Sequence, residues 1–130
     1  MVVDKVSDLI ISIKNAGMVN KDNVEIQYSK FKHQIAKKLH SCGFLDSVEH
    51  KSKPKSRLII KLRYNKNGQH CIHDVKRISR PSHRVYGGSK KILPIKTGRG
   101  VTLLSTPKGI LTDREARREN VGGELLFSIW

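Results

Sequence analysis

The chain has 130 residues, a length that accommodates one domain or two small ones sharing a core. Its 26 Lys and Arg residues outnumber its 11 Asp and Glu residues, so the formal net charge is +15, and hydrophobic residues make up 37%. That apolar content excludes wholesale disorder, and the lack of any apolar run of about 18 residues excludes a transmembrane helix. We also expect no secretory leader, because the first residues lack a long apolar stretch.

The strong positive charge indicates a polyanionic partner. Like charges repel one another in a compact chain, and nucleic acid is the polyanion that best offsets such a field. An acidic membrane surface is the second candidate, and charge that merely keeps the chain soluble is the third. Cys42 and Cys71 lie in dissimilar surroundings and do not suggest a disulfide framework, so a reducing intracellular compartment is expected.

The chain is expected to begin with a helix and a short strand. Residues 6–17 carry apolar residues at the i, i+3, i+4 and i+7 spacing of one helix face. This face contains Val6, Leu9, Ile10 and Ile13. Asp4 can cap the start of the helix and Gly17 can end it. Alternating apolar and polar residues then predict a strand at 24–28.

A second helix, at about 30–42, is predicted to have one apolar and one basic side. Ser29 precedes it as a cap, and Gly43 follows its end. The apolar side is expected to contain Phe31, Ile35, Leu39 and Cys42. The opposite side is expected to contain Lys30, His33 and Lys37. This basic side can face a polyanion, although most such helix faces are simply solvated.

Further strands are expected to complete an α+β unit. A short strand is expected at 44–49, and the clearest alternating pattern of the chain predicts another at 57–64. The Asn67-Gly68 pair is a strong hairpin signal, which predicts a returning strand at 71–78. An antiparallel sheet of this kind can be covered on one face by the helices.

A boundary near Arg80-Pro81 separates an N-terminal half, 1–78, from a β-rich C-terminal half, 79–130. The C-terminal half opens with a basic loop at 79–91. Extended segments and turns are then expected at 92–95, 97–100, 101–105, 109–111 and 124–130.

One short helix is predicted within the C-terminal half. Thr112 and Glu115 fit a capping box, and the helix is expected to end near Asn120. In the last strand, Leu125, Phe127 and Ile129 are expected to share one face. The predicted fold class is therefore α+β: a two-helix, antiparallel-sheet half packed on a β-rich half with one short helix.

The sequence contains no convincing catalytic or metal-binding pattern. The segment 70–74 holds two histidines, a cysteine and an aspartate, but strand alternation would send neighbours to opposite faces, and no second ligand pair follows. Cys71 with His73 lacks an orienting third group. The Gly-Gly-Ser-Lys segment at 87–90 does not match a P-loop. We expect no enzyme, metal or cofactor, and a small hydrolase acting on an acidic substrate is the weakest alternative.

Structured RNA is the polyanion that fits the sequence best. The basic residues are dispersed over loops and helix faces instead of being gathered in a tail. Few aromatic residues are present, which argues against a stacking platform for single strands, and no strongly basic recognition helix stands out. Double-stranded RNA is read largely through its shape and backbone. A basic transcription or chromatin factor is the main alternative.

The segment STPKG, Ser105–Gly109, is the most distinctive local feature. Its hydroxyl groups and backbone amides can bond phosphate, ribose or base edges, unless they are satisfied within a β-turn. Gly122 and Gly123 allow a second backbone to approach closely. Glu124 can read a base amino or imino group, and a salt bridge to a nearby arginine is the open alternative.

Several segments resemble the family of the eighth small-subunit ribosomal protein of the bacterial type. The most specific is GVTLLSTPKGILTDREAR at 100–117, followed by GGE at 122–124. Supporting segments are the opening DKVSDLIISIKNA, then YSKFK and RISRPSHRVY. The resemblance implies an α/β N-terminal half and a β-rich C-terminal half with a short helix.

The resemblance also implies a function and a location. It implies a structural protein of the small ribosomal subunit that binds the central domain of the small-subunit (16S-type) rRNA early in assembly and contacts neighbouring ribosomal proteins. In bacteria, members of the family can repress translation of their own operon's mRNA. The implied location is the ribosome of the cytoplasm or of an organelle, with no membrane and no small-molecule substrate.

The resemblance further implies which residues contact RNA. The principal contact would be made by Ser105, Thr106, Lys108 and Gly109. Beside it would lie Tyr86, Gly122, Gly123 and Glu124. Lys30 and Lys32 would support the contact from the N-terminal half, and Tyr86 would stack on a base or ribose unless it packs on the sheet. We add two basic residues of the loops and helix faces, Arg84 and Arg114.

Overall fold

The computed structural model describes residues 5–53, 55–80, 82–87 and 100–130. Over these residues the chain divides into two compact units, Lys5–Ile72 and His73–Trp130. The predicted cap Asp4, the segment at 92–95 and most of the turn at 97–100 lie outside the described residues.

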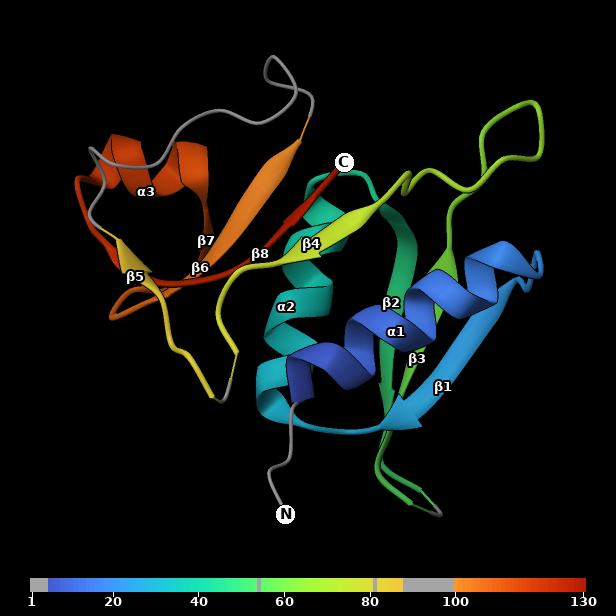
Figure 1. Cartoon of the computed structure of the whole chain (residues 1–130). Helices are drawn as coiled ribbons and strands as arrows, with labels where there is room; N and C mark the ends of the chain where they lie inside the picture. Colours follow the sequence, from blue (N-terminus) through green and yellow to red (C-terminus); the bar gives the residue numbers. More distant parts are fainter. Residues whose placement is uncertain (1–4, 54, 81, 88–99) are drawn as a thin grey trace. The chain divides into compact units, whose positions relative to one another are not determined.

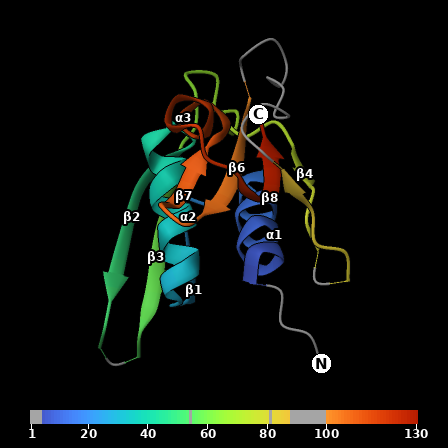
Figure 2. The same cartoon turned by 90° about the vertical axis from the view of Figure 1, so that its left-hand side faces the viewer.

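The N-terminal unit packs α1 and α2 on one face of an antiparallel sheet. Its elements are α1 (Lys5–Met18), β1 (Asn23–Gln27), α2 (Lys30–Ser41), β2 (Leu45–Lys51) and β3 (Arg57–Leu62). The strand order is β1-β3-β2, and α1 and α2 lie on the same side of this sheet (Figures 1 and 2). Alternation along β3 explains the layers, because Leu58, Ile60 and Leu62 are buried whereas Arg57 and Lys61 are exposed.

Helix α1 buries the predicted apolar face, but it does not end at Gly17. The four residues of that face are all buried. The helix continues to Met18, and a Cβ atom on Gly17 would lie 2.1 Å from Nδ1 of His70. The prediction that Gly17 ends the helix is therefore wrong. This residue is glycine because a ring packs against its backbone.

Helix α2 begins where predicted, after Ser29, although the cap works through the backbone. The N–H of His33 donates to the carbonyl of Ser29 at 2.9 Å, and among the described residues the Ser29 side chain makes no capping bond. Gly43 follows the helix with φ +88°, as expected for a C-terminal glycine. The buried face differs from the prediction, because it includes Lys32, of which 8% is exposed.

The hairpin predicted after β3 forms only at its turn. The amide oxygen Oδ1 of Asn65 accepts bonds from the backbone N–H groups of Asn67 and Gln69, and Tyr64 pairs with His70 as an isolated bridge. The prediction of a returning strand at 71–78 is wrong. Strand β3 is already paired on both edges, with β1 and β2, and β4 (Val75–Arg77) pairs with β8 of the C-terminal unit instead.

The C-terminal unit is a sheet with one face partly covered by α3 (Figure 1). Its elements are β4 (Val75–Arg77), β5 (Tyr86–Gly87), β6 (Val101–Thr106), β7 (Gly109–Thr112), α3 (Asp113–Glu119) and β8 (Gly123–Ile129). The strand order is β4-β8-β6-β7, and β5 also pairs with β8. The capping box is confirmed: the Glu115 N–H donates to Thr112 Oγ1, and the Thr112 N–H donates to Glu115 Oε1, both at 3.2 Å.

Strand β8 is buried on both faces, whereas alternation predicted one apolar face. Leu126 and Ser128 are buried together with Phe127 and Ile129. The register between β6 and β8 shifts at Leu103/Leu104, which admits one additional residue of β8 to the interior. The Ser128 hydroxyl is satisfied there by Thr102, with their oxygens 3.1 Å apart.

Candidate nucleic-acid interface

The C-terminal unit brings most of the predicted RNA-contacting residues onto neighbouring strands. Glu124 of β8 pairs with Tyr86 of β5 on one side and with Ser105 of β6 on the other. Directly paired residues of antiparallel strands project from the same face of a sheet. Tyr86 is 69% exposed, so its ring is available at this face instead of packing on the sheet.

The turn between β6 and β7 is held by its own side chains. Thr106 Oγ1 donates to the carbonyl of Gly109 at 2.8 Å and accepts from the Lys108 N–H at 3.2 Å. Gly109 has φ +110°, a conformation that favours glycine. Thr106 is therefore a satisfied turn residue, which was one of the two expectations. Ser105 beside it makes no side-chain hydrogen bond with any residue that the structure describes.

Gly123 is the site of the close backbone approach expected from the glycine pair. A Cβ atom at Gly123 would lie 2.1 Å from the carbonyl oxygen of Ser105 and 3.1 Å from Cα of Thr106. Strands β8 and β6 therefore meet here at a distance that only glycine permits. Gly122, the preceding residue, is half-buried.

Glu124 is held by an ion pair and by a buried hydroxyl. Arg84 Nη1 lies 2.9 Å from Glu124 Oε2, and the Ser79 hydroxyl donates to the same oxygen. The Ser79 hydroxyl also accepts from the Val85 N–H at 3.2 Å, so this network fastens the segment before β5 to β8. The salt-bridge expectation for Glu124 is therefore confirmed. Its side chain is 18% exposed, both bonds go to Oε2, and no described residue bonds the second oxygen, Oε1.

Ser79 is the member of this network that the sequence did not reveal. It is 1% exposed and lies 45 residues before Glu124 along the chain. A serine beside Arg80-Pro81 is indistinguishable from any other loop serine in sequence. The surrounding RISRP segment was interpreted as part of a basic loop, so it did not indicate a buried serine.

The predicted basic contacts are divided between the units. Lys108 is exposed and lies 3.8 Å from Glu119, and Arg114 is exposed on α3. Lys30 is exposed at the start of α2 in the N-terminal unit, whereas Lys32 is buried.

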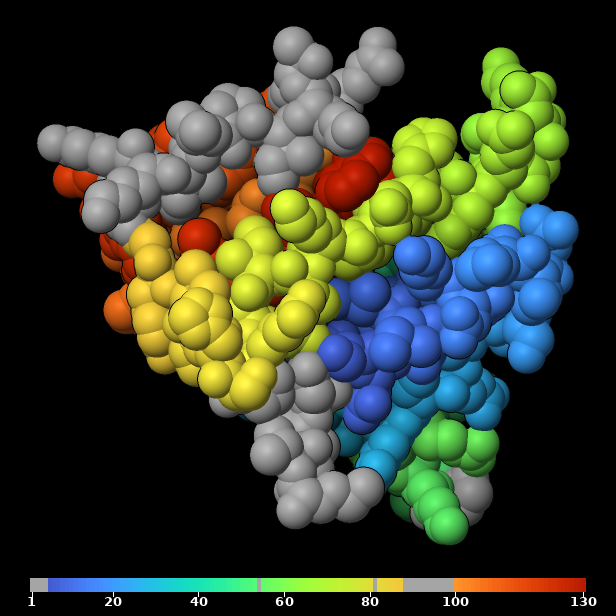
Figure 3. All heavy atoms as spheres, viewed as in Figure 1, coloured from blue at the N-terminus to red at the C-terminus, as the bar shows by residue number. Residues whose placement is uncertain are grey.

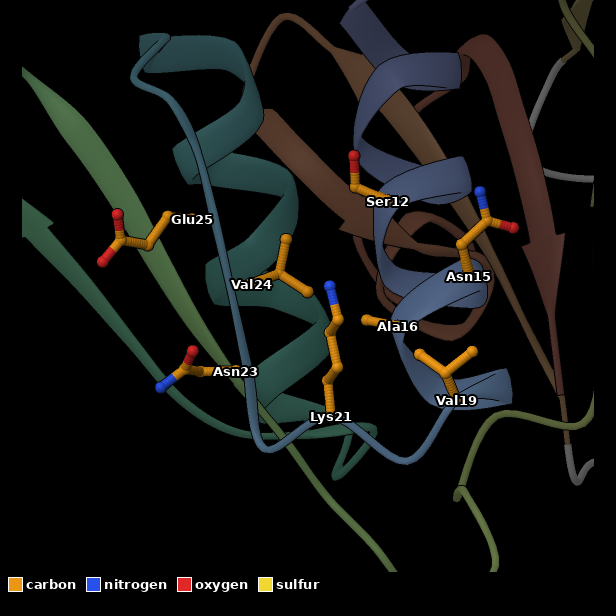
Figure 4. A pocket seen from close by; sticks show the side chains of 8 residues that line it. All are labelled: Ser12, Asn15, Ala16, Val19, Lys21, Asn23, Val24 and Glu25. Atoms are coloured by element: carbon orange, nitrogen blue, oxygen red, sulfur yellow. The ribbon is translucent and has the colours of Figure 1, made fainter.

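A hollow of about 410 Å³ lies between α1 and β1. Figure 4 shows Lys21 between the side chains of Val24 and Ala16 in this hollow. The space-filling view in Figure 3 shows α1 at the surface. Ile11 of α1 and Val19, which follows the helix, are 55% and 64% exposed. The lining of the hollow combines apolar, amide, hydroxyl and oppositely charged groups.

The described residues also offer no metal centre and no membrane span. Among them, no group of three or more His, Cys, Asp or Glu residues could hold a metal ion. No helix in the described ranges is long and apolar enough to cross a membrane.

Known proteins match the whole chain. The family model described as "Ribosomal protein S8" matches residues 4–130. The small ribosomal subunit protein uS8 of Thermus aquaticus is 41% identical over 138 aligned positions, which cover 100% of both chains. The uS8 of Nitrobacter hamburgensis is 45% identical, with 98% of this chain and 97% of the relative covered. The uS8 of Persephonella marina is 41% identical, with 100% of both chains covered.

Proposed function

The chain belongs to the ribosomal protein S8 family, and from this premise we propose that it binds the central domain of small-subunit rRNA and supports its assembly. As a member of this family it is a structural, non-enzymatic constituent of the small ribosomal subunit. Small-subunit rRNA and neighbouring ribosomal proteins are its partners in this proposal.

The observation that carries the proposal is the row formed by Tyr86, Glu124 and Ser105 next to the β6–β7 turn. A rigid row of hydroxyl, carboxylate and aromatic groups across paired strands can read base edges and ribose, because such groups are held in fixed positions. Lys108, in the β6–β7 turn, and Arg114, on α3, are exposed and can neutralise phosphates. In this proposal the row gives specificity and the cations give affinity.

Tyr86 and Ser105 are the groups best prepared for direct contact. The Tyr86 ring is mostly exposed and can stack on a base, and the Ser105 hydroxyl is not engaged by any described side chain. Glu124 can accept a bond from a base amino group through Oε1 while Arg84 and Ser79 hold Oε2. Thr106 and Gly109 act by fixing the turn.

A filter-binding salt titration tests this function. The chain is titrated onto a central-domain rRNA fragment and, as a control, onto an unrelated RNA duplex of equal length. We expect tighter binding of the fragment at every salt concentration and a linear fall of log K with log salt. Equal affinity for both RNAs, or equally strong competition by duplex DNA, would count against specific rRNA binding and favour a general nucleic-acid binder.

We propose, in addition, that the same surface can bind the mRNA of the chain's own operon and repress its translation. A surface that recognises RNA through its charge and shape binds any RNA that has the same local fold. Competition between the operon mRNA leader and the rRNA fragment tests this step. Simultaneous binding of both RNAs, or no binding of the leader, would contradict it.

A further inference from the structure

The N-terminal unit carries a cluster of aromatic rings that the proposed rRNA contact does not use. Tyr28 directly follows β1, His33 lies on α2 and His50 lies on β2. The Tyr28 and His50 rings are stacked, with centroids 3.7 Å apart and an interplanar angle of 9°. The His33 ring meets both edge-on, with centroids at 5.6 Å from Tyr28 and 5.9 Å from His50. We refer to these residues as the ring cluster.

The ring cluster lies beside an open hollow of about 580 Å³. This hollow is lined on one side by Glu25, Ile26, Gln27 and Tyr28 and on the other by Lys55, Ser56 and Arg57. The His50 Nε2 atom is 2.8 Å from the Ser56 hydroxyl, which ties the cluster to the hollow. The hollow thus brings the Tyr28 ring together with the Ser56 hydroxyl and the Lys55 ammonium group, which can contact a phosphate and its sugar.

The charges around the ring cluster are mostly positive. Those of α2 are Lys30 and Lys37, whereas Glu49 and Lys51 of β2 both lie on the face of that strand opposite to His50. Those of the connection to β3 are Lys53 and Lys55. The remaining neighbours, Glu25 and Arg57, neutralise each other in an ion pair of 2.8 Å. In the free chain, a proton on the His33 imidazole therefore meets net repulsion.

The pKa of the His33 imidazole reflects this positively charged environment. Burial, followed by the positive charge of Lys37 and the neighbouring His50, lowers the pKa of His33 from its ordinary value of 6.5. His33 is therefore mainly neutral near pH 7 in the free chain. A phosphate in the hollow would supply the missing negative charge and favour the imidazolium form.

We propose that the ring cluster is a second contact for bound RNA, a phosphate site at which imidazole is protonated as the RNA binds. This inference rests on the proposed RNA-binding function. The chemistry is a proton transfer from solvent to an imidazole nitrogen, balanced by the backbone phosphate that approaches it. By linkage, RNA that raises proton affinity must itself bind more tightly as the pH falls.

Calorimetry of the full chain with the central-domain rRNA fragment tests the proposal. The titration is repeated near pH 7 in two phosphate-free buffers of different ionisation enthalpy, and the difference in heat gives the protons taken up. We expect net uptake in the wild-type chain and weaker binding as the pH rises, by at most about tenfold per pH unit for one linked proton. Uptake is expected to decrease in His33→Gln and in His50→Gln.

The matched control is His73→Gln, since His73 is an exposed histidine of the C-terminal unit. It should keep the wild-type uptake. Binding of the fragment without proton uptake, or uptake that survives in both cluster variants, would overturn the phosphate site while leaving rRNA binding intact. Failure of the wild-type chain to bind the fragment would overturn the proposed function and the phosphate site together.

A measurement on the unaltered chain covers the case in which a variant does not fold. NMR titration of the His33 and His50 imidazole signals gives each pKa with and without the rRNA fragment. We expect the pKa of at least one of them to rise in the complex. Equal values in the free and bound chain would overturn the proposal.

Discussion

Arg84 and Glu124 form an ion pair of 2.9 Å on the C-terminal sheet. The carboxylate is 18% exposed, whereas the guanidinium is 52% exposed. Solvent screens the arginine side of the pair, so its charge contributes little to stability. The pair instead fixes the orientation of a carboxylate that also receives the buried Ser79 hydroxyl. The geometry of Glu124, and with it the free Oε1, depends on these partners.

Glu124→Ala is expected to weaken specific rRNA binding and the fold together. If Oε1 makes a base-edge contact, affinity for the rRNA fragment should fall by about 1–3 kcal/mol, a magnitude measured for such contacts in DNA readout. Removing the carboxylate also leaves the Ser79 hydroxyl without its acceptor, which costs about 1–3 kcal/mol of folding free energy. Filter binding and urea unfolding measure the two effects.

Arg84→Ala provides the comparison for the Glu124 variant. It breaks the same ion pair but keeps the carboxylate and its bond from Ser79. We expect a small effect on unfolding and an intermediate effect on rRNA affinity. If Glu124→Ala binds the fragment as tightly as the wild-type chain, Glu124 is a salt-bridge partner and does not read RNA.

Thr106→Ala is expected to loosen the β6–β7 turn, because the hydroxyl makes both side-chain bonds that close it. Each lost bond costs about 1 kcal/mol, and a looser turn should weaken specific rRNA binding by about 1–3 kcal/mol. Thr106→Ser keeps the hydroxyl and should restore both stability and affinity. Equal loss in the serine variant would mean that the methyl group, and not the hydroxyl, matters.

Gly123→Ala is expected to strain the pairing of β8 with β6. The new Cβ would lie 2.1 Å from the Ser105 carbonyl oxygen, which belongs to the backbone and cannot rotate away. We expect a loss of about 1–3 kcal/mol in the free energy of unfolding, measured in urea. Gly87→Ala is the matched control, because Gly87 is the residue paired with Gly123.

The control differs from Gly123 in what its Cβ would meet. At Gly87 the nearest atom would be Cδ1 of Leu125, at 3.3 Å, and that side chain can adjust. Its loss should stay below about 1 kcal/mol. Similar losses in the two variants would show that glycine flexibility, instead of close approach, sets the cost.

Local features of this fold could be predicted from the sequence. The Thr112–Glu115 capping box uses groups three residues apart, so its pattern contains the whole interaction. The alternation of β3 is equally local, because it needs only one covered face. The STPKG turn between β6 and β7 and the strands beside it follow from the same kind of signal.

Features that depend on distant partners could not be predicted. Residues 75–77 pair with β8 and form no hairpin with β3, and no local sequence pattern predicts this pairing. Gly17 was interpreted as a helix end, whereas its role is set by His70 far along the chain. The Ser79–Glu124 bond and the burial of Lys32 likewise arise from tertiary packing.

Lys108→Ala is expected to weaken binding of all RNAs to a similar degree. Lys108 is exposed, and its ion pair with Glu119 is long, at 3.8 Å, so its ammonium group can turn to a phosphate. Loss of one phosphate contact should reduce the slope of log K against log salt by about 1. Lys108→Arg keeps the charge and should keep the slope. A selective loss for the rRNA fragment would instead assign Lys108 to base readout.

The buried ring of His70 should make the stability of the chain depend on pH. Burial lowers the pKa of His70 from its ordinary value of 6.5, and Nε2 is buried without a hydrogen-bond partner among the described residues. Because the folded pKa is the lower one, the unfolded chain binds the proton more readily. Stability is therefore highest above about pH 6.5 and falls as the pH decreases towards the folded pKa, by at most about 1.4 kcal/mol per pH unit for one proton.

The His70→Phe variant tests this pH dependence, because phenylalanine retains a ring next to Gly17 and Tyr64 but cannot bind a proton. Urea unfolding at about pH 5 and pH 7 should show a smaller loss of stability on acidification than in the wild-type chain. His73→Gln, which alters an exposed histidine, should keep the wild-type dependence. If His70→Phe loses as much stability as the wild-type chain, the acid sensitivity belongs to other groups, of which His33 is the first to examine because its pKa is also lowered.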